Sequence, residues 1–233
     1  MEHIYSHELI EQFKSGKKEF REIALHFSEL DNMNLPGIVF IDSKIEYSRF
    51  WFANLKGAKF INCDIYFSGF YCANLEDVVF DDCTIDMTRF DGATVKDTRV
   101  INSRLSYCLL TNINLGELDF HGSSKFKIIT DPEAITNEEI LDALKIIGNR
   151  SGDLPIEIKS VIQKRIETML KNFNKDTKVS LSPDQKTYGS SVKASNLYQA
   201  MNSFADELIK YGNSEAYKSS FAPYKSRKPY GKE

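Results

Sequence analysis

Side chains that could carry out chemistry are few in this chain, and their spacing does not bring them together. The histidines have neither metal-ligand spacing nor a neighbouring nucleophile: they are His3, His7, His26 and His121. The segment Gly122 to Lys125 is too short for a phosphate-binding loop, and the adjacent Asp81 and Asp82 are expected to be solvated outward residues. We therefore expect no enzymatic activity, no cofactor and no metal ion.

The element that positions these side chains is a repeat of five residues. Every fifth residue from Phe20 to Phe120 is Phe, Leu, Ile or Val, at twenty-one consecutive positions. Five residues of α-helix turn by about 500°, so these residues would spiral around a helix, and an odd step would place them on alternating faces of a strand. The pattern predicts a solenoid that turns a corner every five residues.

Steps of twenty residues place like side chains together, as in Phe20, Phe40, Phe60, Phe80, Val100 and Phe120. A coil of four pentapeptides would stack these residues in the core. Two residues earlier lies a second inward position, which is small over most of the run: Ser43, Ser48, Ala53, Ala58, Cys63, Ser68, Ala73, Cys83, Thr88, Ala93, Thr98, Ser103 and Cys108. Cys63 and Cys83 would lie one coil apart, within reach of a disulfide or a shared metal. Because Ser43 and Ser103 continue their column, buried free thiols are the favoured interpretation.

Two triplets, Ala53-Asn54-Leu55 and Ala73-Asn74-Leu75, match the consensus of the pentapeptide-repeat family: a small residue, Asp or Asn, then Leu or Phe, and two variable positions. Asn residues also form a column at positions 34, 54, 74 and 114. The chain resembles this family over residues 18–122. The resemblance implies a β-solenoid, a right-handed quadrilateral β-helix, and the length of the repeat gives it about five coils.

The segments that flank the repeat are expected to be helical, because the open ends of a solenoid need caps. Residues 1–17 should form a short capping helix that begins at Ser6 and ends near Gly16, with Leu9, Ile10 and Phe13 as its apolar face. Residues 123–175 should form a helical hairpin, part of which would seal the other end. Its second helix is bounded by Asp153 and Pro155 and has an apolar stripe of Ile158, Val161, Ile162, Ile166, Met169, Leu170 and Phe173.

The remaining segments differ in composition. Residues 176–191 are expected to be a linker, and residues 192–212 an amphipathic C-terminal helix. The tail, residues 213–233, is basic and rich in aromatic residues. We expect the tail to be disordered, with docking on a partner or on nucleic acid as the alternative.

Charge is unevenly distributed between the two halves of the chain. Residues 28–122 have 14 acidic and 8 basic side chains, net −6, whereas residues 123–233 have 14 and 18, net +4. A candidate acidic face consists of Asp77, Asp81, Asp82, Asp86, Asp91 and Asp97. Such a face is ordinarily a solvated surface, and the alternative is a mimic of DNA charge. The family resemblance extends this alternative to modulation or protection of a type II topoisomerase such as gyrase.

Large apolar residues at outward positions form a candidate partner interface: Tyr47, Trp51, Phe52, Tyr66, Phe67, Tyr71, Met87 and Tyr107. Contiguous apolar surface of this kind usually marks an interface. Cover by the C-terminal helices, a homodimer contact and a separate protein partner are the three interpretations. We predict a non-enzymatic, cytoplasmic scaffold that binds a protein partner, with a homo-oligomeric structural component as a further alternative. No segment is apolar enough to cross a membrane, and the acidic prism is not expected to bind nucleic acid.

Overall fold

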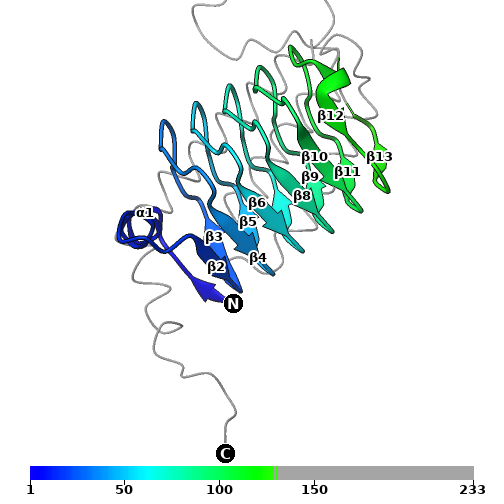
Figure 1. Ribbon diagram of the computed structural model, residues 1–233. Coiled ribbons are helices and arrows are strands. Elements are labelled where there is room, and N and C mark those ends of the chain that lie inside the picture. The colour runs from blue at the N-terminus through cyan, green and yellow to red at the C-terminus, as the bar shows by residue number, and fades with distance from the viewer. Residues whose placement is uncertain (129, 131–233) are drawn as a thin grey trace, which may run out of the picture. The chain divides into compact units, whose positions relative to one another are not determined.

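The computed structural model describes residues 1–128 and 130, and these form a parallel β-solenoid of about six turns (Figure 1). One side is a sheet of seven strands: β1 (Glu2–His3), β3 (Ile23–His26), β5 (Lys44–Glu46), β7 (Asp64–Tyr66), β9 (Thr84–Asp86), β11 (Arg104–Ser106) and β13 (Ser124–Phe126). A second side is a sheet of six: β2 (Glu19–Arg21), β4 (Val39–Ile41), β6 (Lys59–Ile61), β8 (Val79–Asp81), β10 (Thr98–Ile101) and β12 (Leu118–Asp119). The predicted β-solenoid is confirmed.

Every strand of the repeat pairs with residues twenty positions away. Phe40 is in register with Phe20 on one neighbour and with Phe60 on the other. The two sides without strands are joined by single bridges, such as Arg49 with Gly69 and Asn54 with Asn74. The coil therefore has four sides of five residues, as the sequence period predicts.

The core consists of stacked rings. Phe40, Phe60 and Phe80 stack with centroids 5.3 and 4.8 Å apart, and Phe70 and Phe90 stack at 5.2 Å. Edge-to-face contacts join the two columns, for example Phe70 with Phe80 at 6.0 Å. Both geometries are favourable for aromatic rings, so they add to the stabilisation from burial.

The small inward residues also satisfy backbone groups. The hydroxyl of Ser68 donates to the carbonyls of Ile45 and Tyr66, at 3.2 and 3.0 Å. The thiols of Cys83 and Cys108 each donate to a carbonyl of the preceding coil at 3.3 Å. All four cysteines are free thiols; Cys63, Cys83 and Cys108 fill the core as expected, and Cys72 is half-buried.

The corners of the coil are formed by residues with positive φ. In three of the four corner columns most of these residues are Gly, Asn or Asp, the types that tolerate this conformation: Gly37, Gly57, Asp77 and Asp97; Asp42, Asn62, Asp82, Asn102 and Gly122; Asn32, Gly92 and Asn112. The fourth column differs, because it consists of Phe27, Tyr47, Phe67, Met87 and Tyr107, with φ between 48° and 53°. Asn side chains bond between coils, since Asn54 donates to Asn34 at 2.7 Å.

The N-terminal end of the core is covered by α1 (Ser6–Lys14), which lies at the blue end of the prism (Figure 1). Leu9 and Phe13 are buried in the core cluster, as predicted. The expected N-cap, Ser6, is wrong by one residue: Tyr5 is the N-cap, and its N–H donates to the Glu8 carboxylate at 2.9 Å. This bond is the half of a capping box in which the N3 carboxylate accepts from the N-cap amide.

The C-terminal end of the ladder extends past the expected boundary at Gly122. The 3-10 helix η1 (Leu115–Glu117) leads into β12, and β13 then pairs with β11. This strand, together with β1 at the other end, makes the solenoid longer than the expected five coils, because backbone pairing continues without a large inward residue.

Several predicted segments lie outside the described residues: the rest of the helical hairpin 123–175, the linker 176–191, the helix 192–212 and the tail 213–233. In the part of the chain that is described, no helix is long and apolar enough to cross a membrane.

Candidate protein-binding surface

The eight residues predicted to form one outward aromatic surface divide into two groups. Five of them are buried, with at most 7% of their surface exposed: Tyr47, Tyr66, Phe67, Met87 and Tyr107. Trp51 and Tyr71 are half-buried, and Phe52 is 54% exposed. The eight residues therefore differ in accessibility, because only the second group is accessible. We call Trp51, Phe52 and Tyr71 the accessible cluster.

The buried group centres on one corner of the coil. We call Phe27, Tyr47, Phe67, Met87 and Tyr107 the corner seam, since they occupy the same corner in five successive coils. Phe27 stacks on Tyr47 with centroids 5.2 Å apart, and Tyr47 contacts Phe67 at 5.5 Å. Seam residues are 1% to 7% exposed, whereas no residue of the other three corner columns is buried. Stacking along the prism thus accompanies the burial of this column.

The accessible cluster lies around the next corner, on the side bridged by Arg49 and Gly69. A Cβ on Gly69 would stand 2.7 Å from Nε1 of Trp51, so the indole lies against the bare backbone of the coil above. Tyr71 contacts the rings of both Trp51 and Phe52 edge-on, at 5.9 and 5.4 Å. Phe52 is itself a corner residue with φ of 56°. The three rings form a fixed group on a rigid support.

Two arginines flank the indole. The guanidinium of Arg49 lies 4.5 Å from the centre of the Trp51 ring, and that of Arg89 lies 6.0 Å from it. Arg89 also lies 5.3 Å from the Tyr71 ring and binds Asp91 through two bonds of 2.7 and 2.6 Å. Cation–π contacts of this kind hold an indole in place.

Asp31 connects this arrangement to the backbone. Its carboxylate accepts from the N–H of Trp51 at 3.0 Å and pairs with Arg49 at 2.6 Å. Burial of the carboxylate raises the pKa of Asp31, and the bonds to Trp51 and Arg49 oppose that rise. The pKa of Tyr71 is raised by its hydrogen bond with Cys72, so the phenol remains neutral at physiological pH.

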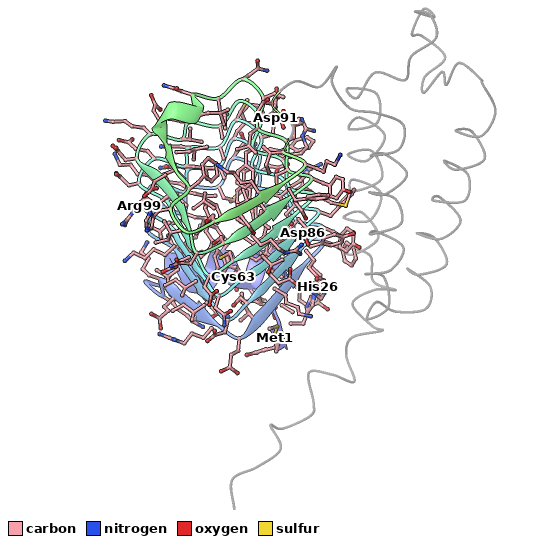
Figure 2. The ribbon with its side chains drawn as sticks, turned by 90° about the vertical axis from the view of Figure 1, so that its right-hand side faces the viewer. Met1, His26, Cys63, Asp86, Asp91 and Arg99 are labelled. Carbon is pink, nitrogen blue, oxygen red and sulfur yellow. The ribbon has the colours of Figure 1, made fainter. Side chains whose placement is uncertain are left out.

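The predicted acidic face is not one face. Asp86 and Asp91 are buried and paired: Arg104 binds Asp86 at 2.9 Å, Ser106 also donates to Asp86, and Arg89 binds Asp91. Asp77, Asp82 and Asp97 are corner residues with positive φ, where Asp is favoured for backbone reasons, and Asp81 accepts from Asn102 at 3.0 Å. These acidic residues lie close together in the sequence, but the coil places them on different sides. Figure 2 shows Asp86 across the prism from Arg99.

One hollow of about 790 Å³ lies beside η1 and is lined by Asp77, Asp97, Thr98, Arg99, Gly116, Glu117, Leu118 and Asp119. The hydroxyl of Thr98 donates to the carbonyl of Leu75 at 2.6 Å. Among residues 1–128 and 130, no group of three or more His, Cys, Asp or Glu side chains is arranged to hold a metal ion.

Comparison with known proteins finds likenesses among solved structures. No known family and no curated protein matches the sequence. A pentapeptide repeat protein from Nostoc is 20% identical, with 51% of this chain and 97% of that chain covered and a TM-score of 0.33. QnrB1, a plasmid-mediated fluoroquinolone resistance protein, is 14% identical, with 56% and 88% covered and a TM-score of 0.33. A pentapeptide repeat protein of the Arabidopsis thaliana thylakoid lumen is 18% identical, with 57% and 79% covered and a TM-score of 0.21.

At these identities the likeness concerns the fold, and the fold is decided by the chain's own coils, with corners every five residues and a register of twenty. The protein is a parallel β-helix whose coil has four sides of five residues. Two features of this β-helix were missed by sequence reasoning: the separation of the corner seam from the accessible cluster, and the fit of Trp51 over Gly69. The sequence did contain a signal for the fit of Trp51 over Gly69, since Gly69 is the one glycine in a column that otherwise consists of Glu29, Arg49, Arg89 and Leu109.

Proposed function

We propose that this β-helix is a non-catalytic scaffold that binds a protein partner through the accessible cluster. The observation that carries the proposal is Phe52, an apolar side chain that is 54% exposed although it occupies a corner where φ is 56°. At the same corner in other coils stand Cys72 and three residues that tolerate positive φ better, Asn32, Gly92 and Asn112. A bulky residue in a conformation it disfavours, with its ring in water, is unfavourable for folding, so its retention supports a role in binding.

The surroundings of Phe52 suit a binding hot spot. Trp, Tyr and Arg are the residues that most often dominate interface energies, and here two rings and two guanidinium groups lie in contact. The rings are held by edge-on contacts with one another, and the indole also lies against Gly69, so little side-chain entropy would be lost on binding. Because Asp31 and Asp91 already neutralise the arginines, the cluster favours an apolar or aromatic side chain of a protein over an anionic ligand.

The proposal is tested by site-specific photo-crosslinking with the full-length chain. A photoreactive phenylalanine analogue at position 52 is compared with the same analogue at position 126, since Phe126 is also 54% exposed but lies outside the cluster. We expect position 52 to capture a defined protein from extracts of the native host, and position 126 not to capture it. Capture of the same proteins from both positions, or of none from position 52, would remove the proposal; capture of a second copy of this chain would make the function self-assembly.

A DNA-mimicking topoisomerase modulator is the other candidate from the sequence, and it has weaker support. The charge of Asp86 and Asp91 is neutralised by Arg104 and Arg89, so a continuous row of phosphate-like charges does not form. Supercoiling assays with purified gyrase distinguish the two functions. The scaffold account predicts no change in gyrase inhibition, DNA relaxation or drug-induced cleavage.

A further inference from the structure

The indole N–H of Trp51 is a hydrogen-bond donor in the accessible cluster that has no acceptor among residues 1–128 and 130. Its atom Nε1 lies against the bare backbone of Gly69 and retains contact with solvent. The backbone N–H of Trp51, by contrast, donates to Asp31 at 3.0 Å. A partner that covers the rings removes water from Nε1, and an unbonded buried N–H is unfavourable. The partner should therefore supply an acceptor at this point.

The backbone beneath the rings is already paired along the prism. The N–H of Phe52 donates to the carbonyl of Tyr71 at 2.9 Å, and the carbonyl of Trp51 accepts from Asn32 at 2.8 Å. The N–H of Gly69 donates to the preceding coil at 2.9 Å. Because these bonds run to the coils on either side, this part of the prism has no open strand edge. A partner strand is therefore not expected to extend the sheet here.

The remaining partner conformations differ in whether their carbonyls are free. The carbonyls of an α-helix, except those of its last turn, are bonded within the helix. A polyproline II segment has no internal hydrogen bonds, so its carbonyls can accept from an indole N–H. Its rigid proline rings also pack on aromatic side chains with little loss of entropy. The Tyr71 ring is inclined to those of Trp51 and Phe52 by 73° and 80°, so the cluster presents faces to successive prolines of a three-sided helix.

The charges around the cluster favour a basic residue in the same segment. Arg49 pairs with Glu29 at 2.8 Å and with Asp31 at 2.6 Å. Arg89 pairs with Asp91 at 2.6 Å, so three carboxylates and two guanidinium groups leave a net charge of −1. The Glu29 side chain is 52% exposed, whereas those of Asp31 and Asp91 are 14% and 10% exposed. Glu29 is therefore the carboxylate that a basic partner side chain can reach.

We propose that the accessible cluster recognises a proline-rich segment of its protein partner in the polyproline II conformation. Proline rings pack on Phe52 and Tyr71, and a basic side chain of the segment pairs with Glu29. A carbonyl of the segment accepts from Nε1 of Trp51. One turn of polyproline II rises about 9.3 Å, close to the ~9.6 Å of two coils, so equivalent side chains of a segment along the prism meet alternate coils. This inference rests on the proposed function, because it names the partner of the same surface.

The first test is a fluorescence titration of the full-length protein, in which Trp51 is the single tryptophan. The probe is a synthetic proline-rich peptide with one central arginine, and its control has the same length and charge with alanine in place of every proline. We expect a saturable change in Trp51 emission with the proline peptide and at least about tenfold weaker binding of the alanine peptide, which loses more entropy on becoming extended. No saturable change up to about 1 mM, or equal affinity for both peptides, would overturn the inference.

The second test measures the two polar contacts by calorimetry, which does not need the tryptophan as a reporter. Trp51→Phe keeps an aromatic ring but removes the N–H, so we expect the proline peptide to bind about two- to tenfold more weakly. Glu29→Gln should weaken this peptide about two- to fivefold and leave a peptide with glutamine in place of the arginine unaffected. Glu29 is exposed, so this variant should fold even if Trp51→Phe does not. Wild-type affinity in Glu29→Gln, or in a folded Trp51→Phe variant, would overturn the inference.

Crosslinking at position 52 separates this inference from the function on which it rests. We expect the crosslinked segment of the captured partner to contain proline beside a basic residue. Capture of a partner whose crosslinked segment lacks proline would overturn this inference and leave the proposed function standing. Capture of no partner would remove the proposed function, and this inference with it.

Discussion

The indole of Trp51 lies against Gly69 of the following coil, so closely that a Cβ on residue 69 would stand 2.7 Å from Nε1. Real Cβ contacts are longer than this, so the indole requires a glycine beneath it. Gly69 is buried and its φ is not positive, which means that its role here is to leave space. This pair is the base of the accessible cluster.

Gly69→Ala should displace the Trp51 ring and lower the free energy of unfolding. In a Trp51→Ala background the same substitution should be nearly neutral, because the conflicting atom is gone. A double-mutant cycle by denaturant unfolding measures the difference, which we expect to be about 1–3 kcal/mol. Equal effects of Gly69→Ala in both backgrounds would show that the indole does not lie over residue 69.

Asp31 should make the fluorescence of Trp51, the single tryptophan, depend on pH. Burial raises the pKa of Asp31, so protonation begins above the usual value of about 3.9 and weakens its pair with Arg49, which lies 4.5 Å from the indole. Because the folded-state pKa is the higher one, the contribution of Asp31 to stability is present below the unfolded-state pKa and is lost as pH rises through the folded pKa.

Fluorescence titration of the wild type should therefore have a midpoint above about 3.9, and Asp31→Asn should lack that transition. Asp82→Asn, an exposed corner residue, is the control and should keep it. A transition that persists in Asp31→Asn would assign it to another group.

Cys72 should be the only cysteine that reacts with a thiol reagent in the folded protein. It is half-buried, whereas Cys63, Cys83 and Cys108 are buried. Burial raises the pKa of Cys108 to about 12, and the hydrogen bond with Cys63 raises the pKa of Cys83, so neither forms the reactive thiolate near neutral pH. The same hydrogen bond lowers the pKa of Cys63, but this thiol is 2% exposed, so we expect the reagent not to reach it. Mass spectrometry after brief alkylation should locate one label, and Cys72→Ser should remove it. Labelling of Cys83 at a similar rate would contradict the packing of the core.

Phe60→Ala should lower the free energy of unfolding by about 3–5 kcal/mol, because it leaves a cavity between stacked rings. Phe60 stacks between Phe40 and Phe80 and also contacts Phe70 edge-on at 5.9 Å. The control Phe126→Ala removes an exposed ring and should change stability by less than about 0.5 kcal/mol. Similar losses in both variants would mean that the inward rings do not form the core.

Phe52→Asn should stabilise the protein while weakening partner binding. Asn tolerates the positive φ of this corner and occurs there as Asn32 and Asn112, so we expect a gain of about 1 kcal/mol in the free energy of unfolding. Thermal unfolding measures the gain, and Tyr71→Asn, at a residue that has no positive φ, is expected not to show it. A loss of stability in Phe52→Asn would indicate that the ring contributes to folding and not to binding.

The sequence predicts the scaffold well because every coil follows the same rule: the apolar residue at each fifth position faces the core. The column from Phe40 to Phe80 and the small residues from Ser43 to Cys108 are in the core, as their spacing requires. The surface was less predictable, since outward columns obey several rules together. Asp82 and Asp97 occupy corners with positive φ, and Asp91 pairs with Arg89. A count of charges along the chain therefore did not predict an acidic face.

The aromatic residues illustrate the same limit. Tyr47 and Phe52 are both outward corner residues by their place in the repeat, yet one is buried and the other is 54% exposed. Tyr47 contacts the rings of Phe27 and Phe67 in the neighbouring coils, whereas Phe52 contacts the edge of Tyr71, and the fivefold period does not encode this. The sequence does show a glycine at position 69 where the neighbouring coils have Arg49 and Arg89. Its structural role is visible only in the fold, because the indole of Trp51 in the preceding coil lies against it.

Whether the accessible cluster binds the partner is decided by the affinity of the crosslinked partner for two variants. Dissociation constants are measured for the wild type, Phe52→Asn and Phe126→Asn, which remove equally exposed phenylalanines. The account predicts that Phe52→Asn weakens binding by about tenfold or more, as expected for a hot-spot side chain, while Phe126→Asn binds as the wild type does. Wild-type affinity in Phe52→Asn, or an equal loss in both variants, would contradict it.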